Sequence, residues 1–176
     1  DGQKFESRLE TFKTRYSSKY FGTNKGVSAI TLIANHAALN AKVIGSNEHE
    51  SHYIFDLLQS NTSEIQPDVL STDTHGVNHV NFALLDLFGY TFAPRYAQFG
   101  KVIEEMFKVS ENKDQGVTLS LKKPIKTDLI IEHWDTIQRI AISLQEKSTT
   151  QAILVRKLSG YSKSHPLLQA LTEYNR

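Results

Sequence analysis

The polar cluster STDTHGVNHV, at residues 71–80, contains the first side chains that could do chemistry. Asp73 follows the apolar pair Val69 and Leu70 and precedes a segment with helical spacing. Its carboxylate is therefore placed either to cap that helix or to hold a metal ion. Aspartate before a helix is a favoured cap, worth about 1 kcal/mol. Spacing alone favours the cap and leaves metal binding open.

Histidine pairs offer a second kind of site. His75 and His79 are four residues apart, and His49 and His52 are three apart. Both spacings can direct two imidazoles from one helix face towards zinc, although neither pair reproduces the His-Glu-x-x-His motif of zinc hydrolases. Surface histidines explain both pairs more simply. The glycines of GTNKG, at residues 22–26, lack the spacing of a phosphate-binding loop.

The segment before Asp73 predicts a hairpin followed by a helix. Residues 27–37 and 39–46 are rich in β-branched and apolar side chains, and a very short connection separates them. Asn47 and Glu50 then have the spacing of a capping box, and apolar residues recur at helical spacing over residues 53–58.

Asp73 itself lies between two short predicted strands. One begins at Val69, and the other covers residues 90–93. A helix that starts near Gly76 and ends at Gly89 connects them. Together with the hairpin, these elements predict a mixed sheet with helices packed on it, and ligands collect at the carboxyl ends of strands in such sheets.

Beyond residue 100 the pattern becomes mostly helical. Weak periodicity over residues 101–128 predicts a connecting region with one short helix. Three helices are expected after it, with the following markers: Trp134, Ile137, Ala141 and Leu144 in the first, Thr149 or Thr150 as cap and Gly160 as end of the second, and Pro166 in the first turn of the last. We therefore divide the chain into a core, residues 1–99, and a connecting and helical part, residues 100–176.

Bulk composition excludes several classes of protein. The 176 residues fit one domain of ordinary globular composition, and no apolar run is long enough to cross a bilayer. The absence of cysteine excludes disulfides and thiolate metal sites and fits a reducing cytosol. A net charge of +1 gives no overall basic excess. Residues 1–25 do carry a mild basic stripe, which is either a solvated face or a track for phosphates.

Several segments resemble one known family in the same order. They are DGQKFESR, RYSSKYFGTNKGVSAITLIANH, VIGSNEHESHYIFDLL, STDTHGVNHVNFALLDLFGYTFAPR, WDTIQRIAISL and LVRKLSGYSKSHPLLQALTEYNR. They resemble the catalytic domain of replicative transposases of the Tn-three family, with TDTHG and FGYTFAPR as the most specific stretches. The resemblance covers essentially the whole chain and is weakest between residues 100 and 125.

This resemblance implies a ribonuclease H-like α/β fold with an Asp-Asp-Glu triad. Asp1 matches the first aspartate and Asp73 the second, both as catalytic and as metal-binding residues. The implied cofactor is Mg²⁺, with Mn²⁺ as a substitute and two ions in the complete site. Cutting and joining DNA is phosphoryl transfer, in which such ions neutralise charge and activate a water or a 3′-hydroxyl.

The third acidic residue is not among the 176 residues. The family's catalytic Glu is expected beyond Arg176, and Glu173 matches an ordinary helix position before it. Most of the first strand is likewise expected before Asp1. We therefore expect a fragment of a longer transposase that is inactive by itself.

Four other positions are candidates for supporting roles or DNA contacts. Thr74 and His75 flank the expected metal site. Glu50 matches an acidic residue on the family's first helix, although the capping box explains it equally well. Arg95 is placed either to hold a DNA phosphate or to form a structural salt bridge.

The function that these inferences favour is a metal-dependent DNA transposase. It would nick the 3′ ends of a transposon and join them to target DNA. The expected partners are transposon-end DNA, target DNA and a second copy of the full-length protein, in the bacterial cytoplasm at the nucleoid and without a membrane. A noncatalytic DNA-binding or assembly module is the alternative, and a zinc hydrolase is the third possibility.

Overall fold

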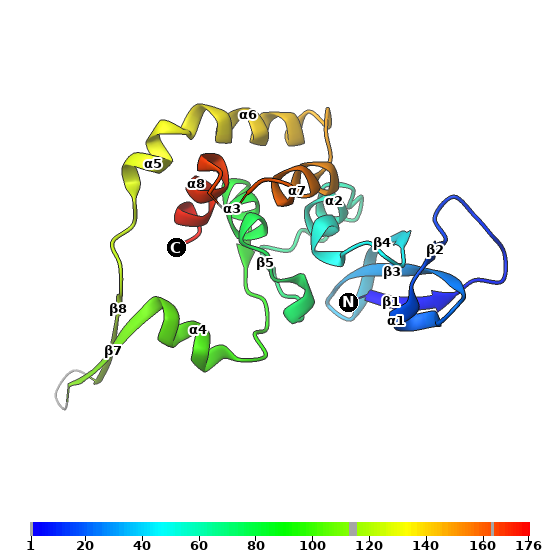
Figure 1. The fold of residues 1–176 in the computed structure, drawn as a ribbon, viewed down its shortest axis with the longest axis horizontal. Helices are drawn as coiled ribbons and strands as arrows, with labels where there is room; N and C mark the ends of the chain where they lie inside the picture. The colour runs from blue at the N-terminus through cyan, green and yellow to red at the C-terminus, as the bar shows by residue number, and fades with distance from the viewer. Residues whose placement is uncertain (1, 113–115, 163) are drawn as a thin grey trace.

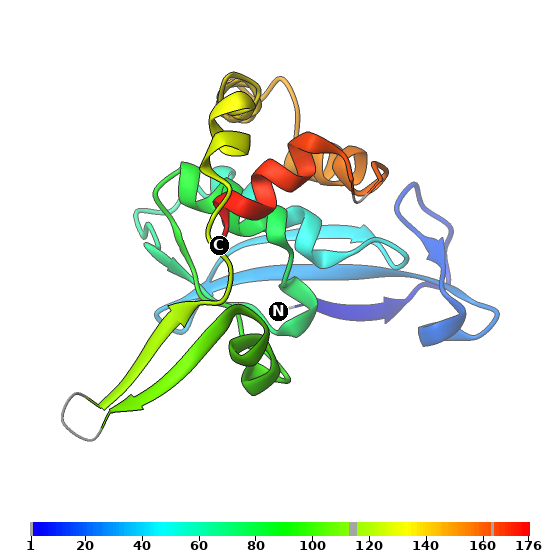
Figure 2. The same cartoon turned by 60° about the vertical axis from the view of Figure 1, so that its left-hand side comes forward.

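The computed structural model describes residues 2–112, 116–162 and 164–176. It has a mixed α/β architecture in which helices cover one face of an antiparallel sheet (Figures 1 and 2). Asp1, the first predicted catalytic residue, lies outside the described residues. Among the described residues, no helix is both long and apolar enough to cross a membrane.

The antiparallel sheet is built around one long strand. Strand β3 (Lys25–Ala34) pairs with β1 (Gly2–Glu6), β2 (Arg15–Tyr16) and β4 (Ala37–Gly45), and the short helix α1 (Ser18–Phe21) lies between β2 and β3. The predicted hairpin is confirmed as β3 and β4. Its turn places Asn35 and His36 at φ angles of 52° and 63°, as a tight turn between antiparallel strands requires.

The helix predicted after the hairpin differs from its prediction. It consists of a 3₁₀ turn, η1 (Glu50–Tyr53), followed by α2 (Ile54–Gln59). The predicted capping box is wrong, because His49 occupies the N-cap position of η1 and its side chain makes no capping hydrogen bond. The Glu50 side chain instead contacts Ser28 and Lys4 on the sheet.

The two short strands around Asp73 form a parallel pair. They are β5 (Val69–Leu70) and β6 (Thr91–Phe92), and the 3₁₀ turn η2 (Thr74–Gly76) and helix α3 (His79–Leu87) connect them. The helix begins three residues later than predicted, because the Asn78 side chain accepts a hydrogen bond from the Val80 N–H and caps it there. Gly89, with φ of 79°, follows its end as expected.

Residues 99–121 contain more structure than the sequence indicates. After α4 (Phe99–Met106), strands β7 (Phe107–Asn112) and β8 (Gly116–Leu121) form an antiparallel hairpin that projects away from the body (Figure 2). This hairpin is missing from the sequence prediction. Its apolar residues alternate for only a few positions, among them Phe107 opposite Leu121 and Val109 opposite Leu119, so its period-two signal is short.

The C-terminal helices are largely as expected. They are α5 (Thr127–Glu132), which was not predicted, α6 (Trp134–Gln145), α7 (Gln151–Ser159) and α8 (Pro166–Tyr174). Thr150 rather than Thr149 caps α7, since its side chain accepts a hydrogen bond from the Ile153 N–H. Pro166 lies in the first turn of α8, where its missing N–H costs nothing.

The expected single mixed sheet is not what the described strands form. They make three small sheets: the four-stranded antiparallel sheet, the β5–β6 pair and the β7–β8 hairpin. Strands β5 and β6 are two residues long and pair with each other, and β7 pairs with β8, so neither pair joins the four-stranded sheet in the described part of the chain. The proposed division at residue 99 stays a prediction.

The main core lies between the helices. Among the described residues, six apolar side chains larger than alanine have no exposed surface and form its centre: Leu84, Leu85, Ile137, Leu144, Val155 and Leu171. Burial of one such side chain contributes about 1.5 to 3 kcal/mol. A second cluster attaches α2 and α7 to the sheet through Ile30, Ile44, Tyr53, Leu57 and Ala152. This packing holds η1 against the sheet and so fixes where Glu50 points.

Candidate functional site

Asp73 caps a helical turn and is also open to solvent. It follows β5 and occupies the N-cap position of η2, where its Oδ1 accepts the His75 backbone N–H at 3.0 Å. The His75 Nδ1 lies 3.0 Å from the other carboxylate oxygen. The Asp73 side chain nevertheless remains 56% exposed. Capping and ligand binding therefore do not exclude each other, since each carboxylate oxygen can accept more than one bond.

The surroundings of Asp73 keep its carboxyl ionised. Partial burial by itself raises the pKa of Asp73, but the hydrogen bond and the charge of His75 lower it by more, helped by the backbone N–H groups of Gly76 and His75. The net result is a pKa below the ordinary value of an aspartate. A carboxylate that stays ionised is the form that binds a cation.

Glu50 lies on the sheet side of the same site. Its Oε1 accepts a hydrogen bond from the Ser28 hydroxyl at 3.2 Å and lies 3.6 Å from the Lys4 ammonium nitrogen. The Lys4 ammonium is also 3.4 Å from the Ser28 hydroxyl. The carboxylate is so close to the Gly2 backbone that a Cβ at Gly2 would overlap it. Glu50 therefore contacts the residue that directly follows Asp1 in the chain.

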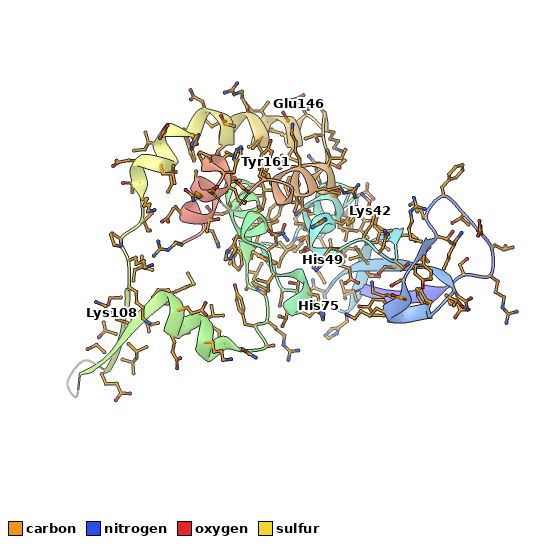
Figure 3. The ribbon with its side chains drawn as sticks, viewed as in Figure 1. Lys42, His49, His75, Lys108, Glu146 and Tyr161 are labelled. Carbon is orange, nitrogen blue, oxygen red and sulfur yellow. The ribbon has the colours of Figure 1, made fainter. Side chains whose placement is uncertain are left out.

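Two adjoining pockets meet at these carboxylates. The larger, of about 570 Å³, lies between α1, η1 and η2. The smaller, of about 340 Å³, lies between β3, η1 and the segments that follow β5 and β6. Glu50 and Asp73 line both pockets. Figure 3 shows His49 and His75 at this junction of the sheet and the helices, far from Lys108 on the projecting hairpin.

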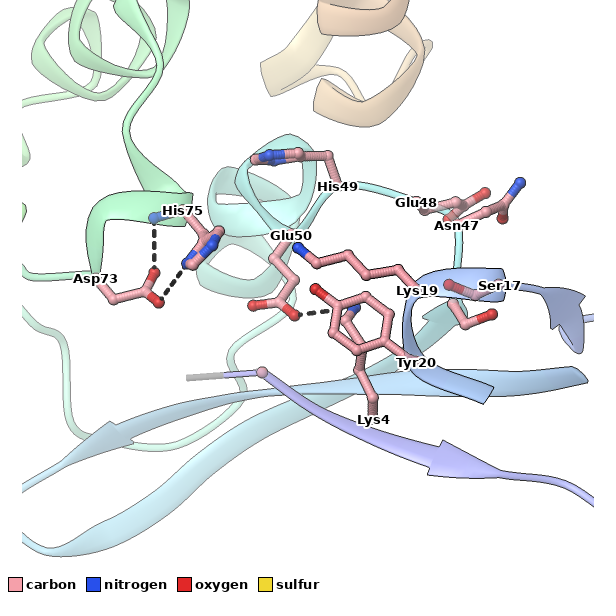
Figure 4. A pocket seen from close by; sticks show the side chains of 12 residues that line it. Lys4, Ser17, Lys19, Tyr20, Asn47, Glu48, His49, Glu50, Asp73 and His75 are labelled. Atoms are coloured by element: carbon pink, nitrogen blue, oxygen red, sulfur yellow. Dashed lines mark hydrogen bonds and ion pairs between the residues drawn. The ribbon is translucent and has the colours of Figure 1, made fainter. Parts of the chain in front are cut away.

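Lysines and one tyrosine form the other wall of the larger pocket. The Lys4 and Lys19 ammonium nitrogens lie 4.7 and 5.0 Å from the centre of the Tyr20 ring. Figure 4 shows Lys4, Lys19 and Tyr20 facing the side of the site that bears Glu50 and Asp73. The pocket thus combines carboxylates, which suit a cation, with ammonium groups, which suit a phosphate.

Thr74 and Arg95 have different roles in this geometry. The Thr74 hydroxyl donates to the Arg95 carbonyl and accepts the Ala97 N–H, both at 3.1 Å, so it joins η2 to the segment after β6. The backbone N–H of Arg95 donates to the Thr72 carbonyl at 2.8 Å, and Arg95 lines the smaller pocket. Within the described residues no salt bridge involves the Arg95 guanidinium, which leaves the phosphate-binding prediction open.

The donor atoms present suit a hard divalent cation only in part. Asp73 and Glu50 contribute carboxylate oxygens to a shared pocket, the ligand type that Mg²⁺ and Mn²⁺ prefer. Residues 2–112, 116–162 and 164–176 contain no group of three or more His, Cys, Asp or Glu side chains that could hold a metal ion. Neither predicted histidine pair therefore forms a complete zinc site with other described side chains.

Comparison of the sequence with known proteins shows which family the chain belongs to. A family model described as the Tn3 transposase DDE domain matches residues 1–176. The chain belongs to the Tn3 transposase DDE domain family. This membership implies the use of divalent metal ions in general, and it confirms the resemblance inferred from the sequence.

Similar curated proteins are transposases of several bacteria. The transposase for transposon Tn3926 of Escherichia coli is 30% identical over 182 residues, and the transposase for transposon Tn4556 of Streptomyces fradiae is 29% identical over 179 residues. The transposase for transposon gamma-delta of Escherichia coli strain K12 is 26% identical over 178 residues. The match covers the whole of this chain but only 18 to 20% of these relatives. No solved structure matches the chain.

Sequence reasoning about this Tn3 transposase DDE domain missed the partners of its acidic residues. Lys4 was assigned only to a general basic stripe, and Ser28 was not singled out. These two residues are directly opposite each other on β1 and β3. The alternation of polar residues along the two strands gives a weak signal for this pair, but only the strand register brings both side chains to Glu50.

Proposed function

We propose that this domain carries part of the active site of a DNA transposase, with Asp73 as a catalytic and metal-binding residue. The observation that carries the proposal is the position of Asp73 in a chain that matches a DDE domain over its whole length. Its exposed, ionised carboxylate lies at the end of β5 beside a pocket that also contains lysines. Asp1, which precedes Gly2 of β1 in the sequence, is proposed as its partner.

The order of the elements supports a ribonuclease H-like fold for the domain. An antiparallel group of strands is followed by a helix and then by a parallel strand–helix–strand unit. In such an arrangement acidic residues from separate strands meet at one edge, where oxygen ligands can converge. Asp73 at the end of β5 and Asp1 before β1 are the residues assigned to that edge.

The chain's own residues have three tasks in the proposed mechanism. His75 and the backbone of η2 hold the Asp73 carboxylate ionised and in one orientation. Lys4 and Lys19 attract a DNA phosphate into the larger pocket, and Arg95 is proposed to do the same at the smaller one. Two Mg²⁺ ions, replaceable by Mn²⁺ and held by Asp1 and Asp73, would supply charge neutralisation and an activated water or 3′-hydroxyl.

The proposed reaction is the cutting of transposon 3′ ends and their joining to target DNA during replicative transposition. Transposon-end DNA and target DNA are the substrates, and a dimer of a longer protein that contains this segment is the proposed assembly. We place this protein in the bacterial cytoplasm, in contact with the nucleoid. In-line phosphoryl transfer by metal ions needs positioning and charge stabilisation rather than a covalent protein intermediate.

Strand transfer by the full-length transposase that contains these residues tests the proposal. Asp73→Asn and Asp1→Asn keep the side-chain size but remove the charge. Each should lower strand transfer by at least about a thousandfold, because loss of one member of a group of residues that act as a unit removes most of the rate enhancement of that unit. Asp68→Asn is the matched control, since Asp68 is an exposed aspartate just before β5 and lines neither pocket.

Retained activity of either Asp73→Asn or Asp1→Asn would refute the two-aspartate assignment. Loss of strand transfer in all three variants would point to general misfolding instead. A protein that binds transposon-end DNA with unchanged affinity in all variants but transfers no strand even as wild type would favour the noncatalytic DNA-binding module.

A further inference from the structure

A fully buried asparagine lies behind the two acidic turns. Asn81, on α3, has no exposed surface. Its side-chain N–H₂ group donates to the Ser51 carbonyl at 2.8 Å and to the Gly76 carbonyl at 3.3 Å. Ser51 directly follows Glu50 in η1, and Gly76 is the last residue of η2, the turn that Asp73 caps. One side chain therefore bridges the turns that carry the two pocket carboxylates.

A second buried amide holds this asparagine in place. Gln151, the first residue of α7, also has no exposed surface, and its side-chain N–H₂ donates to the Asn81 side-chain oxygen and, at 3.3 Å, to the Ser51 carbonyl. Its side-chain oxygen accepts the Phe55 N–H at 2.7 Å. Its own backbone N–H donates to the Asp56 carboxylate at 2.8 Å. Both the nitrogen and the oxygen of the Asn81 side-chain amide are thus hydrogen-bonded.

Close packing and separate side-chain contacts hold each of the two turns, η1 and η2. A Cβ at Gly76 would overlap the Thr72 side chain, so η2 folds tightly back on the residue before Asp73. Apart from the hydrogen bonds of Asn81 and Gln151, each turn has its own contacts. The side chains of Asp73 and Thr74 hydrogen-bond in and around η2, and those of Ser28 and Lys4 contact Glu50 of η1. The Asn81 side chain is the element that contacts the backbone of both.

We propose that Asn81, supported by Gln151, is a positioning residue that sets the spacing of the Glu50 and Asp73 turns and thereby the cation affinity of the site. The inference rests on the proposed function, because it assumes that Asp73 binds a divalent cation. Buried hydrogen bonds of this kind orient metal ligands, and their loss commonly lowers metal affinity by about ten- to a hundredfold.

The test uses Mn²⁺ alone as the probe and the 176-residue chain. Mn²⁺ affinity is measured by water-proton relaxation, and amide hydrogen exchange is measured at Gly76 and Val77, whose N–H groups donate within η2. Asn81→Leu preserves the approximate size and removes both donated bonds. We expect Mn²⁺ to bind about tenfold more weakly and both amides to exchange at least about tenfold faster, while the amides of α6 keep their rates.

Asn40→Leu is the matched control. The Asn40 side chain also donates two hydrogen bonds to a helical segment, to the Leu57 carbonyl at 2.8 Å and to the Ser60 hydroxyl at 2.9 Å. These bonds hold the far end of α2 rather than the acidic turns. Asn40→Leu should therefore leave Mn²⁺ affinity and the Gly76 exchange rate unchanged even where it lowers global stability.

A second variant protects the test against misfolding. If circular dichroism shows that Asn81→Leu does not fold, Asn81→Ser replaces it. The hydroxyl of the introduced serine is a single donor, so it can replace only one of the two hydrogen bonds that Asn81 donates to the Ser51 and Gly76 carbonyls. Wild-type Mn²⁺ affinity together with wild-type exchange at Gly76 and Val77 in the folded variant would overturn the inference. Failure of the wild-type chain to bind Mn²⁺ would overturn the inference about cation affinity, whereas binding that Asp73→Asn leaves intact would contradict the proposed function. In both cases the exchange rates would still decide whether Asn81 positions η2.

Discussion

The close approach of Glu50 to Gly2 predicts an energetic coupling between the two residues. A Cβ at Gly2 would overlap the Glu50 carboxylate, which lies at the end of a flexible side chain and so can move aside. Movement would break its hydrogen bond from Ser28, at 3.2 Å, and its ion pair with Lys4, at 3.6 Å. The substitution Gly2→Ala therefore acts mainly through Glu50 and its two partners.

The expected size of this coupling follows from those contacts. A hydrogen bond to a charged group contributes about 1.5 kcal/mol at the lower end of its range, and a partly exposed ion pair about 0.5 kcal/mol. Replacement of Gly by Ala returns about 0.5 kcal/mol, because it restricts the unfolded chain. Gly2→Ala should thus lower the free energy of unfolding by about 1.5 kcal/mol when Glu50 is present.

A double-mutant cycle measures the effect directly. In the Glu50→Ala background the overlap is gone, so Gly2→Ala should be neutral or stabilising by about 0.5 kcal/mol, which gives a coupling energy of about 1.5 to 2 kcal/mol. Urea unfolding followed by the fluorescence of Trp134, the single tryptophan, supplies the four free energies. Gly100→Ala is the control, because its Cβ would meet open space. An equal cost of Gly2→Ala in both backgrounds would refute the reasoning.

Two further predictions concern ionisation. The pKa of the Asp73 carboxyl, measured by NMR, should lie below the ordinary value of an aspartate and should rise in His75→Ala. The stabilisation that this carboxylate gives the folded state is complete above its unfolded pKa of about 3.9. It is lost as the pH falls through the lower pKa of the folded state. Partial burial and the hydrogen bond from its hydroxyl to Asp86, at 2.7 Å, raise the pKa of Tyr174 to about 12. Tyr174→Phe should therefore lower the free energy of unfolding by about 1 kcal/mol at neutral pH, and the difference should shrink as pH rises from about 10 towards 12.

Each ionisation prediction has its own contradicting result. An Asp73 titration that is the same with and without His75 would show that the imidazole does not stabilise the carboxylate. For Tyr174, the control is Tyr16→Phe, since the Tyr16 side chain is more than half exposed. Equal and pH-independent effects of the two tyrosine substitutions would mean that the contact between α8 and α3 adds nothing to stability.

Elements with strong local signals were predicted from the sequence. The hairpin of β3 and β4, the short strands β5 and β6, the cap at Thr150 and the proline at the start of α8 all depend on residues close together in the chain. Their propensities, caps and turn residues act over a few positions, so spacing is sufficient to find them. The same holds for Asp73, whose capping role follows from its place before a helical turn.

Features that depend on long-range contacts were missed or misassigned. Glu50 has the spacing of a capping box, yet packing of η1 on the sheet directs it to Ser28 and Lys4. The β7–β8 hairpin was not predicted because its pattern is short and polar. Local spacing carries no information about which strand register or helix contact is formed, because those depend on burial of residues far apart in the chain.

The sequence by itself determined the family resemblance, the helices and strands with clear periodicity, and the capping role of Asp73. Only the tertiary structure decided which groups surround that residue. Asn81 and Gln151 are 70 residues apart and meet in the core, where unpaired amides would be costly, so their hydrogen bonds become specific only after α3 and α7 pack together. The chemistry of the site is thus encoded locally, whereas its geometry is a product of the fold.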